Sequence, residues 1–169
     1  MQKKPPLILT LRIESKSQAF FDAQRQIYFP PKRNFLSAHL TLFHQLPDEE
    51  DTHRYLVSLQ FHSFPIQITG LQNLGSGIAY KAESAQLQAL HHQIRDYFLA
   101  KLIPQDQQPF RPHITIMNKS TPEKVQALLT DLTSGFKPFS ITAIGVDLWT
   151  YLGGPWHFER TISFHSQPY

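Results

Sequence analysis

Hydrophobic and polar residues alternate along several short stretches of the chain, and elsewhere apolar residues recur every three or four positions. Residues 7–13 alternate with a period of two, which is typical of a β-strand. Residues 84–102 carry apolar side chains at helical spacing. The pattern predicts helices over residues 17–28, 52–61, 84–102 and 122–134, and strands over residues 7–13, 37–44, 65–74, 78–82, 113–118, 139–151 and 156–165. In the first helix the spacing of Phe20, Ala23, Gln24 and Ile27 suggests one face.

Two of the predicted strands repeat one short motif. His39-Leu40-Thr41-Leu42 and His113-Ile114-Thr115-Ile116 each place a histidine and a threonine on one face of a strand and two aliphatic residues on the other. After each motif the predicted elements follow in the same order: an acidic helix start, a helix and two strands. His44 lies an odd number of positions from His39, so we expect it to point away from the His/Thr face unless a β-bulge intervenes.

A duplicated unit usually implies pseudo-twofold symmetry, which would bring the two His/Thr faces together. The expected fold is therefore α+β, with duplicated βαββ-type lobes, two antiparallel sheets facing a central cleft and helices outside. We expect residues 1–169 to form one bilobal domain, with the first lobe centred on residues 30–82 and the second on residues 110–165.

Composition narrows the classes of function. The 169 residues are 41% hydrophobic and 17% charged, which is enough apolar material for a core. The absence of cysteine excludes disulfides and thiolate metal sites and fits a reducing cytoplasm. No run approaches the roughly 18 apolar residues of a membrane span, so we expect a cytoplasmic protein without a membrane partner. The net charge of +3 mildly favours an anionic partner.

Two histidines facing one cleft are suited to cleaving a phosphodiester by acid–base chemistry. One neutral imidazole can take a proton from the nucleophile, and one protonated imidazole can give a proton to the leaving oxygen. A threonine hydroxyl on the same face can donate a hydrogen bond to the phosphate. Neither motif has a metal-ligand pattern beside it, and the acidic run at residues 48–51 is better explained as the start of a helix. His91 and His92 are expected on a helix surface.

On these motifs the chain resembles the 2H phosphoesterase superfamily, and within it the bacterial RNA 2′,3′-cyclic phosphodiesterases, or LigT-like 2′-5′ RNA ligases. The resemblance implies a LigT-like fold and catalysis by His39, Thr41, His113 and Thr115, without a metal or other cofactor. It also implies that RNA ends or nucleotide-derived cyclic phosphates are the substrates. Which histidine is the base stays open, as does the direction of the reaction. We expect a monomer.

Arginine side chains suit phosphate binding, and aromatic side chains suit base stacking. The candidate substrate-binding residues are Arg12, Lys32, Arg33, Phe43, Arg111, Tyr151, Trp156 and Arg160. Two alternatives stay open besides the phosphodiesterase. One is a non-catalytic RNA- or nucleotide-binding module with the same fold, and the other is a metal-dependent hydrolase that uses several histidines.

Overall fold

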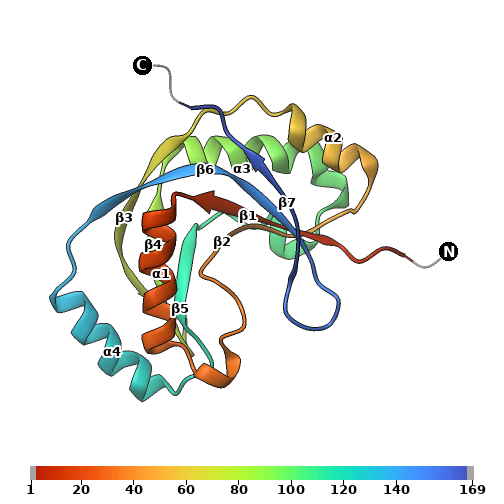
Figure 1. The fold of residues 1–169 in the computed structure, drawn as a ribbon. Helices are drawn as coiled ribbons and strands as arrows, with labels where there is room; N and C mark the ends of the chain where they lie inside the picture. The colour runs from red at the N-terminus through yellow and green to blue at the C-terminus, as the bar shows by residue number, and fades with distance from the viewer. Residues whose placement is uncertain (1–2, 167–169) are drawn as a thin grey trace.

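The computed structural model describes residues 3–166, and the predicted helices and strands are all present in it (Figure 1). The elements in chain order are β1 (Leu7–Ile13), α1 (Ser15–Tyr28), η1 (Pro31–Arg33), β2 (Leu40–Leu46), α2 (Glu50–Ser58), β3 (Phe64–Asn73), β4 (Ile78–Glu83), α3 (Ala85–Phe98), η2 (Leu99–Lys101), η3 (Pro104–Gln107), β5 (His113–Met117), α4 (Pro122–Ser134), β6 (Phe139–Thr150) and β7 (His157–Ser163). Helix α3 ends at Phe98 rather than at residue 102, where the chain continues as η2. No helix within the described residues is long and apolar enough to cross a membrane.

The strands form one curled antiparallel sheet in the order β2-β1-β6-β3-β4-β5, with β7 also paired to β6. The order is symmetric, because exchanging β1 with β4, β2 with β5 and β3 with β6 reproduces it in reverse. The α+β fold and its duplication are thus as expected, but the two halves share a sheet. The long strand β6 joins them by pairing with β3 over its first residues and with β1 over its later ones.

The curl of the sheet brings its two end strands toward each other. Strands β2 and β5 lie close together in the middle of the molecule, with α1 packed against β5 (Figure 1). These are the two strands that carry the repeated motif. The symmetry of the strand order therefore places the two motifs at facing edges.

Within each motif the predicted alternation holds. The aliphatic residues Leu40, Leu42, Ile114 and Ile116 are at most 2% exposed, whereas both histidines and both threonines are half-buried. Burying one aliphatic side chain of this size stabilises the folded state by about 1.5–3 kcal/mol. The motif aliphatics thus anchor the two strands in the core and leave the His/Thr faces accessible.

The alternation breaks directly after the first motif. Thr41 pairs with Thr10 of β1, whereas Phe43 pairs with Leu9, so Leu42 is an extra residue that forms a β-bulge. Leu42 and Phe43 therefore both face the core, and His44 returns to the face of Thr41. The prediction that Phe43 binds the substrate is wrong, because Phe43 is 0% exposed. The expected outward orientation of His44 fails for the same reason.

The prediction for His91 of α3 is also wrong, because the bulge turns Phe43 toward the core, where it stacks on the ring of His91. The ring of His91 lies between the rings of Phe43 and Phe110, with centroid distances of 4.4 and 4.0 Å and nearly parallel planes. Its side chain is buried, not on the helix surface as predicted. Burial lowers the pKa of His91 to about 4, so the ring is neutral at pH 7 and acts as a core aromatic. His92 is exposed, as predicted.

A buried carboxylate holds the bulged segment in place. Asp106 of η3 accepts hydrogen bonds from the backbone N–H groups of His44 and Gln45, at 2.9 to 3.0 Å, and lies 2.8 Å from Nδ1 of His44. Burial alone would raise the pKa of Asp106, but the hydrogen bonds from His44 and Gln45 outweigh it and lower the pKa. Asp106 is therefore ionised at neutral pH and ties η3 to β2.

Replacing Asp106 with asparagine should lower the free energy of unfolding by about 1–3 kcal/mol, because an amide leaves part of this donor set unpaired. In the folded state the pKa of Asp106 lies below its ordinary 3.8, so its contribution is present above that pH and is lost as the pH falls below it. Urea denaturation of the wild type and Asp106→Asn at about pH 7 and about pH 2.5 should give a smaller difference at the lower pH.

The exposed Asp96→Asn serves as the matched control and should change stability by less than about 0.5 kcal/mol. A difference between wild type and Asp106→Asn that is the same at both pH values would contradict the assignment.

Candidate active site

The two motif histidines are held in the same way. His39 directly precedes β2, and its Nδ1 lies 2.8 Å from the carbonyl oxygen of Ser37. His113 is the first residue of β5, and its Nδ1 lies 2.9 Å from the carbonyl oxygen of Arg111. A carbonyl oxygen only accepts hydrogen bonds, so Nδ1 carries a proton in both rings. In each ring Nε2 is then the nitrogen available for proton transfer.

His39 lines two adjoining hollows of about 480 and 650 Å³. The first, named here the β1 hollow, is also lined by Thr10, Arg12, Asp147, Trp149 and Trp156. The second, named the loop hollow, is also lined by Arg25, Arg33, Phe35, Thr115, Asn118, Tyr151 and Trp156. The second motif thus reaches the loop hollow through Thr115, on the strand face that it shares with His113. His113 itself is not among the residues that line either hollow.

His39 is neutral at physiological pH. Burial lowers its pKa to about 4, and the charges of Arg25, His113 and His44 lower it further, against the opposing effect of the Ser37 carbonyl. The ring of Trp156 lies over it, with 4.7 Å between the ring centroids. The influence of a charge on His113 shows that the two motif histidines share one electrostatic environment. The free Nε2 of His39 can therefore accept a proton at pH 7.

Arg25 of α1 is a buried cation that the sequence reasoning missed. It is 4% exposed, and it donates to the side-chain oxygen of Asn34 at 3.1 Å and to the carbonyl oxygen of Thr115 at 3.2 Å. Its guanidinium lies 4.0 Å from the ring centre of Phe29. Both acceptors are neutral, and within residues 3–166 Arg25 makes no ion pair. Burial lowers the pKa of Arg25, and the charge of Asp22 on the same helix offsets this effect only in part. A buried charge without an ion pair is costly, so this end of the loop hollow favours an anion.

Two of the predicted aromatic residues lie at the hollows. Trp156 borders both of them, and Tyr151, half-exposed, borders the loop hollow. Trp149, which was not predicted, donates from Nε1 to the hydroxyl of Thr10 at 2.9 Å, with its ring centroid 6.4 Å from that of Trp156. The tryptophans thus give the region around His39 an aromatic wall.

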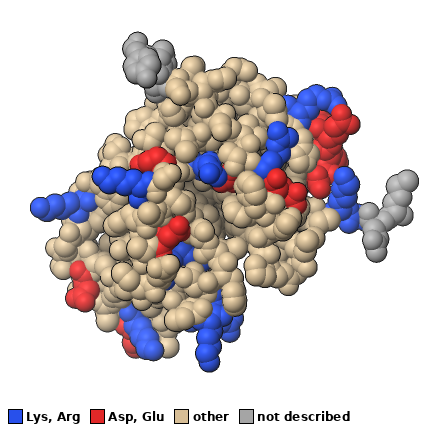
Figure 2. Space-filling view, in the orientation of Figure 1, with Lys and Arg blue, Asp and Glu red and all other residues tan. Residues whose placement is uncertain are grey.

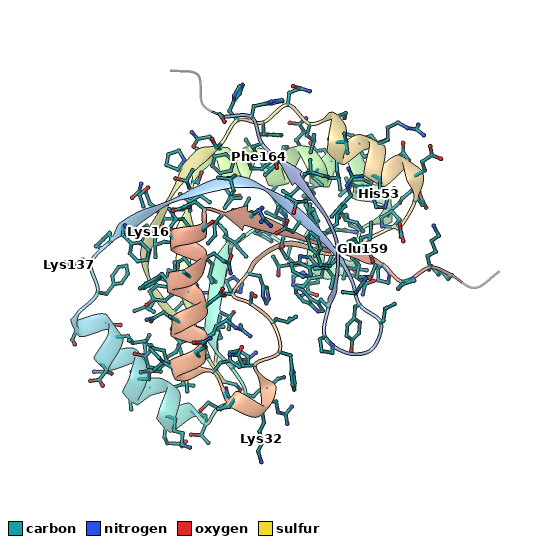
Figure 3. The ribbon with its side chains drawn as sticks, in the orientation of Figure 1. Lys16, Lys32, His53, Lys137, Glu159 and Phe164 are labelled. Carbon is teal, nitrogen blue, oxygen red and sulfur yellow. The ribbon has the colours of Figure 1, made fainter. Side chains whose placement is uncertain are left out.

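Only two of the predicted cations, Arg12 and Arg33, line the hollows. Arg12 lines the β1 hollow, but its Nη1 is held by Asp147 at 3.2 Å and by Thr161 at 3.3 Å. Arg111 contributes its backbone carbonyl to His113, while its side chain is exposed. Arg160 on β7 lines neither hollow. Lys32 extends from η1 away from the body of the molecule (Figure 3).

On the face shown in Figure 2, charged side chains are spread rather than gathered. Figure 2 shows lysine and arginine side chains interspersed with acidic ones over this face. Within the described residues no group of three His, Cys, Asp or Glu side chains lies close enough to hold a metal ion. Attraction of an anion therefore depends on the local groups at the hollows, with Arg25 at one end.

Residues 13–155 match the model of the 2′-5′ RNA ligase superfamily. The chain belongs to this superfamily. Its fold is similar to that of TT0787 from Thermus thermophilus, with a TM-score of 0.65, 18% identity and coverage of 96% of this chain and 100% of that one. It is also similar to E. coli LigT in complex with 3′-AMP, with a TM-score of 0.63, 16% identity and coverage of 95% and 98%. At this identity the likeness shows the fold alone, and no curated protein sequence matches the chain.

For this superfamily member, the titration of His39 tests the electrostatics of the site. The ring signals of His39 in NMR spectra should titrate with a midpoint of about 4. Arg25→Met removes a positive charge that disfavours the imidazolium, so it should raise the pKa of His39. Lys137 (Figure 3) lies in the loop before β6, lines neither hollow and is not among the charges that act on His39. Lys137→Met removes the same charge there and should leave the midpoint unchanged. A wild-type midpoint near the ordinary 6.5 would contradict the description of the site.

Proposed function

We propose that the protein is a metal-independent phosphodiesterase that acts on 2′,3′-cyclic phosphate ends or 2′-5′ linked RNA or nucleotides. His39 and His113 act as the general base and acid. The observation that carries the proposal is the matched anchoring of the two rings. In each, Nδ1–H donates to the carbonyl oxygen two residues earlier, and Nε2 has no hydrogen-bond partner among residues 3–166. The coupling of their charges and the adjoining hollows support it.

The low pKa of His39 favours it as the base for hydrolysis. Nε2 of His39 takes a proton from water while the water oxygen bonds to phosphorus. The bond from phosphorus to one ribose oxygen breaks, and Nε2 of a protonated His113 gives its proton to that oxygen. One water is consumed, and a phosphate monoester and a hydroxyl are formed. Each positioned proton transfer contributes about 10²–10⁴-fold to the rate.

The charge that develops on the non-bridging oxygens needs hydrogen-bond donors and positive charge. The hydroxyls of Thr41 and Thr115 are assigned the donor role, since each shares the strand face of its histidine. Arg25 supplies the fixed positive charge beside Thr115. Because Arg25 already makes two hydrogen bonds to neutral acceptors, it is held in place before the substrate arrives.

A nucleotide suits the hollows in size and lining. The neighbouring E. coli LigT has been crystallised with 3′-AMP and with NADP+. Here Trp156 and Tyr151 offer aromatic surfaces on which a base can stack, next to the histidine and the buried arginine. We therefore assign the base to the Trp156 side of the site and the phosphate to the space between the motifs.

Replacing either motif histidine with alanine should lower kcat on a nucleoside 2′,3′-cyclic phosphate by at least about 10²-fold, with turnover of the wild type unaffected by EDTA. His92→Ala is the matched control, since His92 is an exposed histidine on α3. Full turnover by His113→Ala would show that the pair is wrongly assigned. Salt-dependent RNA binding without turnover of any substrate would favour the non-catalytic module.

The pH profile tests which histidine is the base. A base must be unprotonated to act, so kcat/KM of the wild type should fall as the pH drops through about 4. In Arg25→Met the same fall should occur at a higher pH, because the pKa of His39 is then raised. An acidic limb that stays in place in this variant would remove His39 as the base.

A further inference from the structure

A third histidine lies on the face of β2 that carries His39 and Thr41. Phe43 pairs with Leu9 and faces the core, so His44, the next residue, faces the same way as Thr41. Its side chain is 44% exposed, whereas Leu42 and Phe43 are buried. A charge on His44 also lowers the pKa of His39. The bulge has thus added an imidazole to the same electrostatic environment, and the proposed reaction has no use for it.

The ring of His44 is fixed by Asp106. The carboxylate lies 2.8 Å from Nδ1 and is itself held by two backbone N–H groups, with only 2% of its side chain exposed. Nδ1 therefore carries the proton, and Nε2 is the nitrogen directed away from the carboxylate. An ionised carboxylate at this distance compensates the charge of the ring whenever Nε2 is protonated.

The remaining neighbours of His44 leave Nε2 available. The amide Nε2 of Gln105 is 3.5 Å away, at the limit of a hydrogen bond. His39 is neutral at pH 7, and the buried His91, which lies on the α3 side of Asp106, is neutral as well. Within the described residues Asp106 is the one carboxylate that pairs with His44. It contacts Nδ1 and not Nε2. An anion approaching Nε2 meets no opposing negative group among these contacts.

A purely structural role for the ring accounts for its contact with Asp106 but not for the exposure of its other edge. The two backbone N–H groups already tie Asp106 to the bulge. The imidazole adds a further hydrogen bond to the buried carboxylate, and nearly half of its side chain stays exposed to solvent. An imidazole that carries a proton on Nε2 can donate a hydrogen bond to a phosphate oxygen.

We propose that His44, held by Asp106, binds a second phosphate of the substrate, next to the one that reacts. This inference rests on the proposed function. Because Leu42 is the extra residue of the bulge, His44 is the next side chain after Thr41 on this face of β2. Neighbouring side chains on one face of a strand are about 7 Å apart. This separation is comparable to that of successive phosphates in an extended single strand. The preferred substrate is therefore an oligonucleotide end with at least two phosphates rather than a mononucleotide cyclic phosphate.

The test compares a nucleoside 2′,3′-cyclic phosphate with a dinucleotide that ends in the same cyclic phosphate. His44→Gln keeps an amide donor for Asp106 but removes the imidazole. It should lower kcat/KM about tenfold more for the dinucleotide than for the mononucleotide, through KM rather than kcat. His44→Lys keeps a cation beside Asp106 and should restore most of the preference. His92→Gln is the control for loss of a histidine elsewhere and should keep the wild-type ratio.

A binding experiment separates this inference from the proposed reaction. The affinities of a nucleoside 3′-phosphate and of a dinucleotide 3′-phosphate can be measured by calorimetry even if the protein turns over nothing. His44→Gln should weaken the dinucleotide selectively, also about tenfold. Equal effects on both ligands, or no effect on either, would overturn the role of His44. Loss of turnover in the motif variants together with an unchanged ratio in His44→Gln would leave the phosphodiesterase standing and remove only this inference.

Discussion

The long strand β6 is the constraint on which the site depends. It pairs with β3 over Phe139–Ala143 and with β1 over Ala143–Thr150, so one continuous strand belongs to both halves of the sheet. Strands β2 and β5 lie at the two ends of the strand order, whose central pair is β6 and β3. The curl of this shared sheet then brings the ends together. Two motifs that are far apart in the sequence meet because hydrogen bonds through β6 fix the geometry between them.

The two halves are similar in framework but not in electrostatics. Each presents a histidine whose Nδ1 is fixed by a backbone carbonyl. A β-bulge follows each motif, at Leu42 in β2 and at Ile116 in β5. Only the first motif is followed by a third histidine, and the buried Arg25 donates to the second motif strand. A symmetric fold thus carries an asymmetric distribution of charge. This asymmetry suits a reaction in which one histidine starts neutral and the other starts protonated.

Local signals predicted the elements well. The side chain of Ser84 caps α3 by accepting the N–H of Leu87, and Thr121 caps α4 by accepting that of Lys124. Alternation also predicted the buried aliphatics of both motifs. These features depend on residues a few positions apart, so one sequence contains the information needed for them.

The features that the sequence did not predict depend on distant partners. The bulge at Leu42 is visible only in the pairing with β1, and it is held by Asp106, 62 positions from His44. The buried face of α1 consists of Ser17, Phe21 and Arg25 rather than the predicted one, and Ile27 is 65% exposed. Arg25 contacts Thr115, 90 positions away. Arg25 lies four residues after Phe21, and this spacing was the only sign in the sequence that Arg25 shares the buried face of α1. A buried arginine on that face can be explained only when β5, the strand to which it donates, is known.

The central claim is that His39 and His113 act on one phosphate. A crystal structure of the protein with a bound nucleoside 3′-phosphate tests this most directly. The account predicts a phosphate oxygen within about 3 Å of Nε2 of each ring, with Arg25 nearby. A phosphate bound elsewhere, or two rings too far apart to touch one phosphate, would contradict it.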